Sequence, residues 1–303
     1  MRHTAIGIDI GGTNLRVAHV TGAGEMLNGL TETITPDPES LLGRIIALCR
    51  QFDDSSVAAI GVGVPGRVDA QRRAILSGGY INLAGVPLAE QLEQSLGKSV
   101  TIDNDCNMAL VAEMATGAAR DVENVVMFTI GTGIGGAIAM DGRILRGRAT
   151  AGQLGHLTVA HDGLPCACGR RGCVETTSSG TALGHLIVGA GLPPETRVDI
   201  LLRRETEGDA ISARVLSDWA MPLRAAIDSM VAAVDPDLVL LGGGLGSAAH
   251  RALRRAPAQA QWYRCAVQAA ALGDEAGMIG AAISALASTD NSVFSITHPE
   301  MRG

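Results

Sequence analysis

Three polar residues in a row lie where a predicted strand passes into a predicted helix. The apolar stretch 100–102 is typical of a strand and residues 106–115 of a helix, with Asp103, Asn104 and Asp105 between them. Either aspartate could serve only as the helix N-cap, but three residues able to bind hydroxyl groups exceed what a cap requires. We therefore expect Asp105 to accept a proton from an alcohol, and Asn104 to orient that alcohol for transfer of a phosphoryl group.

A glycine pair near the N-terminus follows a strand that ends in a carboxylate. The apolar runs 5–10 and 15–20 flank a Gly-Gly turn and predict a β-hairpin. Glycines allow backbone N–H groups to converge on phosphate oxygens, Thr13 adds a hydroxyl, and Asp9 can hold Mg²⁺ through water. An ordinary hairpin turn with an incidental aspartate is the alternative. The candidate cofactor-binding residues of this turn are Asp9, Gly11, Gly12, Thr13 and Asn14.

Two further glycine-rich turns follow later strands. Residues 131–136 match the G-x-G-x-x-G pattern of dinucleotide-binding proteins, but the stretch 137–140 predicts a strand where that motif requires a helix. A second phosphate-binding turn, or a purely structural turn, remains. Residues 242–244 end another strand, and their bare backbone could accommodate an adenosine ring or simply form a tight turn. The candidate cofactor-binding residues are Gly131, Thr132, Gly133, Gly135, Gly243 and Gly244.

Three of the six cysteines cluster downstream of a histidine. His156, Cys166, Cys168 and Cys173 supply one imidazole and three thiolates, and the intervening glycines permit sharp turns. This ligand set is typical of a closed, tetrahedral structural Zn²⁺ site. Bound zinc would fix the loop that carries Glu175. The other cysteines, Cys49, Cys106 and Cys265, lie in apolar segments and are expected to be buried thiols.

Composition limits the classes of partner. The 303 residues are 47% hydrophobic and 18% charged, with a formal net charge of −7 and 2% aromatic residues. An acidic chain with few aromatic side chains argues against nucleic acid as the main partner. The apolar runs 4–10 and 57–65 are too short for a membrane span, and no targeting signal is visible, so we expect a cytoplasmic protein without a membrane partner.

The order of predicted elements indicates a two-lobed α/β protein. Each half begins with a strand, a glycine-rich turn and a second strand, and ends with helices, which suggests a distant duplication. We expect an N-terminal lobe at 1–115, a C-terminal lobe at 116–287 whose last helix packs back on the first lobe, and a polar tail at 288–303. The predicted helices are 38–52, 86–96, 106–115, 179–191, 194–206, 209–234 and 277–287.

Taken together, these motifs resemble the ROK family of sugar kinases and repressors, over about residues 5–287. The most specific element is the cysteine spacing together with the run Gly172-Cys173-Val174-Glu175. The resemblance implies the actin/hexokinase-like (ribonuclease H-like) fold with a duplicated βαβ-type core and a zinc-bearing loop.

The family resemblance also assigns site residues and ligands. It implies ATP and Mg²⁺ at the two phosphate turns, adenosine at 241–245, structural Zn²⁺ at the cysteine cluster, and Asp105 as the catalytic base. Asn82 matches a weaker landmark of the family. The substrate-binding residues that the resemblance implies are Gly66, Arg67, Asn82, Asn104, Asp105, His156 and Glu175.

One residue departs from the family pattern. The family usually has Gly-Glu-x-Gly-His, whereas this chain has Gln153 in place of the glutamate. Glutamine has two donor hydrogens and one acceptor oxygen, whereas glutamate only accepts. Since the family glutamate contacts the sugar near C1 and C2, Gln153 favours a substrate that differs from glucose at C2; a harmless local exchange is the alternative.

The function that the resemblance implies is ATP-dependent transfer of the γ-phosphate to the 6-hydroxyl of a hexose or N-acetylhexosamine. We expect a homodimer whose partners are a small sugar and MgATP. A non-catalytic sugar sensor of the same family is the alternative. A DNA-binding repressor of the family would need a helix-turn-helix domain ahead of the sugar lobe, and the first hairpin, which starts by residue 5, leaves no room for one.

Overall fold

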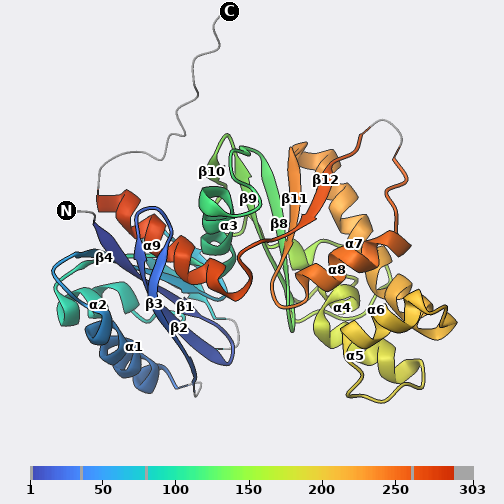
Figure 1. Ribbon diagram of the computed structural model, residues 1–303, viewed down its shortest axis with the longest axis horizontal. Coiled ribbons are helices and arrows are strands. Elements are labelled where there is room, and N and C mark those ends of the chain that lie inside the picture. The colour runs from blue at the N-terminus through green and yellow to red at the C-terminus, as the bar shows by residue number, and fades with distance from the viewer. Residues whose placement is uncertain (1–2, 35–36, 79–80, 261–262, 290–303) are drawn as a thin grey trace, which may run out of the picture. The chain divides into compact units, whose positions relative to one another are not determined.

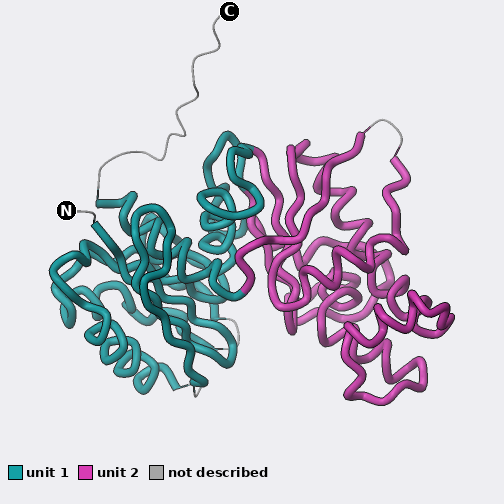
Figure 2. The backbone as a smooth tube through the Cα atoms, viewed as in Figure 1, with its two compact units in different colours: residues 1–123, 139–151, 274–303 teal, residues 124–138, 152–273 magenta. Residues whose placement is uncertain are grey.

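The computed structural model describes residues 3–34, 37–78, 81–260 and 263–289. The chain forms two compact units (Figure 2). The first comprises residues 1–123, 139–151 and 274–303, and the second residues 124–138 and 152–273. Most of the tail predicted at 288–303 lies outside the described residues. Within those residues, no helix has both the length and the apolar character needed to cross a membrane.

The first unit is built on a five-stranded sheet in the order β3-β2-β1-β4-β7. β1 (Thr4–Ile10) and β2 (Asn14–Thr21) form the predicted antiparallel hairpin, and β2 continues antiparallel to β3 (Met26–Thr33). On its other side β1 pairs in parallel with β4 (Val57–Val64), which pairs in parallel with β7 (Ser99–Asn104). β5 (Arg67–Asp69) and β6 (Ala74–Ser77) form a separate two-stranded sheet.

The two faces of the first sheet pack differently. One face carries large aliphatic residues that pack against α1 (Pro38–Phe52) and α2 (Leu88–Leu96). The other face carries mainly alanine and glycine and lies against α9 (Ala276–Thr289), which also contacts α3 (Asp105–Thr116) (Figure 1). The chain therefore sends its last helix back to the sheet that its first strands build.

Close approach of α9 depends on glycine. A Cβ atom on Gly7 would lie 1.9 Å from the Met278 carbonyl oxygen, and one on Gly61 would lie 1.8 Å from the Ala281 carbonyl oxygen. Gly280 of the helix meets α3 just as closely. Backbone atoms cannot move aside as side-chain ends can, so these positions accept no side chain.

The second sheet has the order β10-β9-β8-β11-β12. β8 (Val125–Ile130) pairs in parallel with β11 (Leu238–Gly242), which pairs in parallel with β12 (Ala266–Ala269). β9 (Ile134–Met140) begins in the second unit; its last residues and β10 (Arg143–Ile144) are assigned to the first. Among the described residues, the helices of the second unit are α4 (Glu175–Ser178), α5 (Gly180–Gly189), α6 (Val198–Thr206), α7 (Ala210–Val234) and α8 (Gly246–Ala252), with short 3-10 segments at Leu154–His156 (η1) and Leu253–Arg255 (η2). A third 3-10 segment, η3 (Gly273–Glu275), begins at the last residue of the second unit and continues into the first.

We predict that Gly61→Ala lowers the thermal midpoint by about 5 °C or more, because the new methyl group collides with the backbone of α9. Gly43→Ala is the matched control: Gly43 is exposed inside α1 and a Cβ there meets nothing within 4 Å. Because alanine favours helix over glycine, the control should melt at the wild-type temperature or above it. Equal melting temperatures of Gly61→Ala and wild type, measured by circular dichroism, would contradict the close packing of β4 against α9.

Candidate functional site

The carboxyl ends of the parallel strands bring two aspartates into one row. Asp9 of β1 is the register partner of Gly63 on β4, and Gly63 is the partner of Asp103 on β7. Gly63 also lies beside the start of α3, because a Cβ there would be in van der Waals contact with the Asp105 Cα atom (3.4 Å). The sheet register thus gathers acidic residues, distant in sequence, at one edge of the first unit.

Asn104 is the N-cap of α3, so neither neighbouring aspartate fills that role. Its Oδ1 accepts from the backbone N–H groups of Cys106 (3.0 Å) and Asn107 (3.3 Å). Its Nδ2 donates to the Gly66 carbonyl oxygen (2.9 Å) and to Asp105 Oδ1 (2.8 Å). Both amide hydrogens are therefore used inside the protein, and Asn104 orients the Asp105 carboxylate while tying it to the loop after β4.

Asp105 has a strongly perturbed acidity. Burial among the surrounding protein atoms raises the pKa of its carboxyl to about 7, and the negative charge of Asp9 adds to the increase. Hydrogen bonds from the Cys106 N–H and from Asn104 oppose the shift without cancelling it. A carboxylate with a pKa near neutrality, at the end of a parallel strand, is suited to general base chemistry.

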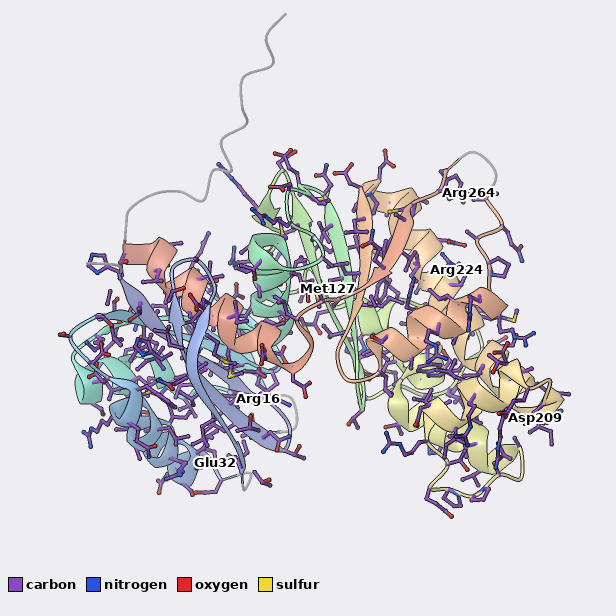
Figure 3. All side chains as sticks on the ribbon, in the orientation of Figure 1. Arg16, Glu32, Met127, Asp209, Arg224 and Arg264 are labelled. Carbon is purple, nitrogen blue, oxygen red and sulfur yellow. The ribbon has the colours of Figure 1, made fainter. Side chains whose placement is uncertain are left out.

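Asp9 is paired with an arginine of the neighbouring strand. Arg16 on β2 is labelled in Figure 3. It donates from Nη1 to Asp9 Oδ2 (3.2 Å), and its Nη2 lies 3.7 Å from Asp274 Oδ2. Burial raises the pKa of Asp9, and the Arg16 charge opposes that rise. A Cβ on Gly277 would lie 2.7 Å from the Asp9 Cγ atom, so the first turn of α9 also closes on this carboxylate.

The turn between β1 and β2 has the predicted form. The Gly11 N–H donates to the Asn14 carbonyl oxygen (2.8 Å), which closes the turn. Gly12 and Thr13 are exposed at its tip, whereas Asn14 is already the first residue of β2. The tip therefore presents backbone to solvent immediately after Asp9.

The remaining candidates of the first unit lie around the β5–β6 hairpin. Gly66 has a φ of 93°, and a Cβ there would lie 2.2 Å from the Ser77 carbonyl oxygen, so glycine is required. Arg67 donates from Nε to the Ala149 carbonyl oxygen (3.4 Å). Asn82 is exposed and accepts from the Ala84 N–H (3.2 Å), as in a local turn. Gly66 contacts the base motif, defined as Asn104 and Asp105, directly through Asn104, whereas Asn82 has a local partner.

In the second unit, the turn after β8 is anchored by the start of α5. The Gly131 carbonyl oxygen accepts from the Gly180 N–H (2.8 Å), and the Thr132 carbonyl oxygen accepts from the Thr181 hydroxyl (2.9 Å). The turn is shorter than the sequence predicted, because β9 already begins at Ile134 and includes Gly135. The hydrogen bond from the Gly131 N–H to the Gly133 carbonyl oxygen (3.0 Å) closes it within three residues.

The start of β9 gathers three predicted sugar-binding residues nearby. Glu175, at the first position of α4, accepts from the Ile134 N–H (2.9 Å). Gln153 and His156 belong to the segment around η1, where a Cβ on Gly155 would lie 2.0 Å from the Ile134 carbonyl oxygen. Ile134 is therefore the common neighbour that holds η1 and α4 together.

The loop after β11 lies beside the end of β8. Gly243 has a φ of 76°, and a Cβ there would lie 2.6 Å from the Ile130 carbonyl oxygen, which also accepts from the Leu245 N–H (2.9 Å). Gly244 faces open space. The predicted adenosine turn and the second phosphate turn are therefore neighbours within the second unit.

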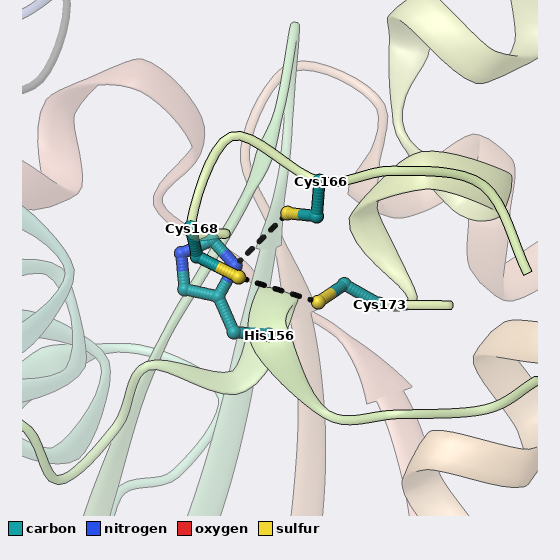
Figure 4. A group of neighbouring side chains, drawn as sticks. All are labelled: His156, Cys166, Cys168 and Cys173. Carbon is teal, nitrogen blue, oxygen red and sulfur yellow. Dashed lines mark hydrogen bonds between the residues drawn. The ribbon is translucent and has the colours of Figure 1, made fainter. Parts of the chain in front are cut away.

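The four predicted metal ligands converge (Figure 4). His156 Nδ1, Cys166 Sγ, Cys168 Sγ and Cys173 Sγ all lie within 4.8 Å of one another. The Cys166–His156 and Cys168–Cys173 ligand atoms are 3.6 Å apart. Two sulfurs bound tetrahedrally to one zinc at about 2.3 Å would be about 3.8 Å apart, so the cluster fits that ion.

The loop that carries the cysteines folds back on itself. The Cys166 N–H donates to the Arg170 carbonyl oxygen (2.8 Å), and the Gly169 N–H donates to the Cys166 carbonyl oxygen (3.0 Å). Gly172 has a φ of 72° and lies so close to Ala160 that a Cβ would be 1.7 Å from its carbonyl oxygen. Backbone turns, rather than disulfides, bring the ligand atoms together, and Glu175 follows Cys173 by two residues.

The chain has the actin/hexokinase-like fold. Two five-stranded mixed sheets, with glycine turns at the ends of their strands, and the similarity to solved ROK family structures support this class. The family model "ROK family" matches residues 5–288. The chain therefore belongs to the ROK family, which confirms the resemblance seen in its sequence.

The named relatives include glucokinases and N-acetylmannosamine kinases. A glucokinase of Halalkalibacterium halodurans is 30% identical, with 91% of this chain and 92% of that protein covered. An N-acetylmannosamine kinase of Yersinia pestis is 34% identical, with 92% and 97% covered. Among solved structures, a ROK family glucokinase from Streptomyces griseus in complex with glucose and AMPPNP is 29% identical, with a TM-score of 0.80 and 93% and 99% covered.

We predict that purified protein contains about one zinc per chain, and that Cys173→Ser loses it, because three remaining ligands leave the tetrahedral set incomplete. Cys265→Ser is the matched control, since Cys265 lies outside the cluster and should keep full occupancy. Elemental analysis by mass spectrometry measures both. Wild-type protein that is folded, as shown by a cooperative thermal transition, but contains no zinc would contradict the assignment of a zinc site.

Proposed function

We propose that this chain is an ATP-dependent sugar kinase that transfers the γ-phosphate to the 6-hydroxyl of a hexose or N-acetylhexosamine. The observation that carries the proposal is the Asp105 carboxylate, oriented by Asn104 and raised to a pKa of about 7, in a chain of the ROK family. Relatives named glucokinase and N-acetylmannosamine kinase, similar over nine tenths of the chain, support the reaction class.

Asp105 is the proposed catalytic base. Phosphoryl transfer asks little covalent chemistry of a protein, so positioning of the reacting groups and compensation of charge dominate the catalysis. The Asp105 carboxylate would accept the hydrogen bond of the attacking hydroxyl and take its proton as the O–P bond forms. The hydrogen bonds to Asp105 Oδ1 from Asn104 and Cys106 fix the direction in which the carboxylate faces.

The glycine turns are the proposed nucleotide-binding elements. The exposed tip at Gly12 and Thr13 would bind phosphate oxygens, as would the turn at 131–133, and the open backbone at Gly244 would accept the adenosine. Asp9 would hold a Mg²⁺ ion, because its carboxylate is partly exposed (14%) at the end of β1 and Arg16 is its one cationic partner among the described residues. Mg²⁺, when bound, neutralises charge on the phosphates.

The remaining predicted residues are proposed sugar contacts. Gly66, Arg67 and Asn82 in the first unit, and His156 and Glu175 in the second, supply backbone, cationic, amide, imidazole and carboxylate groups for hydroxyls. Asn104 has both amide hydrogens engaged with Gly66 and Asp105, and its oxygen caps α3, so its contribution to the sugar would come through Asp105. Zinc at the cysteine cluster would hold the loop that leads to Glu175.

A sugar sensor without catalysis is the alternative. A ROK family transcriptional regulator, a homolog of the E. coli MLC protein, is 25% identical with a TM-score of 0.78, and 78% of that chain is covered. The two functions differ in one observable, namely sugar-dependent release of ADP. A coupled assay over glucose, mannose, allose, N-acetylglucosamine and N-acetylmannosamine separates them and names the acceptor.

We predict that Asp105→Asn lowers kcat by about a thousandfold while the sugar dissociation constant, measured by calorimetry, stays within a few fold. The amide keeps the shape of the side chain but cannot take the proton. In wild type, kcat/KM should fall as pH decreases through about 7, because the raised pKa lets the carboxyl take up a proton there. Asp121→Asn, on an exposed side chain, is the control. Full turnover in Asp105→Asn would disprove the role.

We predict that Gln153→Glu raises the ratio of kcat/KM for glucose to that for N-acetylmannosamine by about tenfold. The reason is that glutamate only accepts hydrogen bonds and would favour a free hydroxyl at C2 over an acetamido group. Gln51→Glu adds the same charge on the exposed end of α1 and should leave the ratio unchanged. An unchanged ratio in Gln153→Glu would mean that this side chain does not read C2.

A further inference from the structure

A buried carboxylate precedes the base motif and is not explained by it. Asp103 has a side chain that is only 2% exposed. Its Oδ1 accepts from the Asn104 N–H (2.7 Å) and from Asn107 Nδ2 (3.0 Å), while its Oδ2 accepts from Arg146 Nε (2.7 Å). A buried charge is costly unless it is paired and hydrogen-bonded. Arg146 therefore supplies the charge that makes this carboxylate tolerable in its place.

Arg146 reaches Asp103 from a loop 43 residues further along the chain. It follows β10, in the part of residues 139–151 that belongs to the first unit. Ala149 in this loop has a φ of 65°, a conformation that costs energy for any residue with a side chain. Its N–H donates to the Arg146 carbonyl oxygen (3.0 Å), and its own carbonyl accepts from Arg67 Nε (3.4 Å). Two arginines thus fasten a strained loop beside the base motif.

The hydrogen bonds form a continuous path to the proposed base. Arg146 holds Asp103, Asp103 accepts from the Asn104 backbone, and the Asn104 side chain donates to Asp105. Asn107 adds a second connection, because its side chain donates to Asp103 and its backbone donates to the N-cap. The first turn of α3, which carries Asp105, is therefore fixed at both its backbone and its cap by groups that depend on Asp103.

We propose that Arg146, acting through Asp103, is a positioning residue for phosphoryl transfer that sets the orientation of Asp105. The inference rests on the proposed function, because it assigns Arg146 a part in that reaction. The physical basis of the proposal is that the Arg146 guanidinium compensates the buried charge of Asp103. Without it, Asp103 turns toward water, and the N-terminal turn of α3 moves with it.

Steady-state kinetics test the proposal on three single variants. In Arg146→Met we expect kcat to fall about 10- to 100-fold with the KM for ATP unchanged, because misorientation of the base affects turnover and not nucleotide binding. Arg146→Lys keeps a cationic donor and should remain within about threefold of wild type. Arg143→Met, on exposed β10 in the same hairpin, is the matched control and should remain within about twofold.

A double-mutant cycle shows whether Arg146 and Asp103 act as a pair or independently. Asp103→Asn in the Arg146→Met background removes the uncompensated charge, so the double variant should be no slower than Arg146→Met alone. If the losses of the two single variants multiply in the double variant, the residues act independently and the proposed path is wrong.

A second readout needs no catalysis. Cys106 lies next to Asp105 in the first turn of α3 and is 9% exposed. Alkylation by iodoacetamide, followed at the Cys106 peptide by mass spectrometry, should be at least fivefold faster in Arg146→Met than in wild type or Arg143→Met. Equal alkylation rates, in variants with equal melting temperatures, would overturn the proposal.

The two readouts distinguish failure of this inference from failure of the proposed function. If wild type phosphorylates no sugar but Arg146→Met exposes Cys106, the proposed function is wrong and the path from Arg146 to α3 stands. If wild type is active and Arg146→Met matches Arg143→Met in kcat and in Cys106 alkylation, the proposed function stands and the positioning role is rejected.

Discussion

Three carboxylates meet at the carboxyl edge of the first sheet, and each has to be compensated for the unit to fold. Asp9 and Asp103 flank Gly63 across three parallel strands, and Asp105 is the first residue of α3. Arg16 pairs with the first and Arg146 with the second, whereas Asp105 accepts hydrogen bonds from Asn104 and Cys106. Burial raises the pKa of Asp105, and the negative charge of Asp9 adds to the increase, so Asp105 retains the raised pKa of a base.

The scaffold that imposes this crowding depends on small residues. Glycines on β1, β4 and α9 let backbone meet backbone, so the last helix closes over the strands that carry Asp9 and precede Asp105. Glycine allows the same close approach in the second unit. Gly155 lets η1 lie against β9, and Gly243 lets the loop after β11 lie against β8. Glycine in this chain therefore permits close backbone contacts between elements as well as turns.

Strongly patterned elements could be predicted from the sequence, because local periodicity determines them. Residues 38–52 form the predicted helix with the same bounds, and the four zinc-ligand candidates converge. β3 and β12 were missed because they are edge strands whose exposure leaves no apolar run. Arg146 has no local sequence signal, since its partner lies 43 residues away, and the sequence does not show that the Asn104 amide donates to Gly66 and Asp105. Register and side-chain pairing are tertiary properties that local patterns do not encode.

Membership of the ROK family and the geometry around Asp105 lead to one account, in which an oriented carboxylate accepts the proton of a sugar hydroxyl as the phosphoryl group arrives. The most direct measurement follows the label of γ-³²P-ATP in the wild-type protein over a panel of hexoses and N-acetylhexosamines. The account predicts that label moves to the 6-position of at least one sugar, and that no label is released without a sugar. Label that remains on ATP with every sugar, or that appears only as inorganic phosphate, would contradict it.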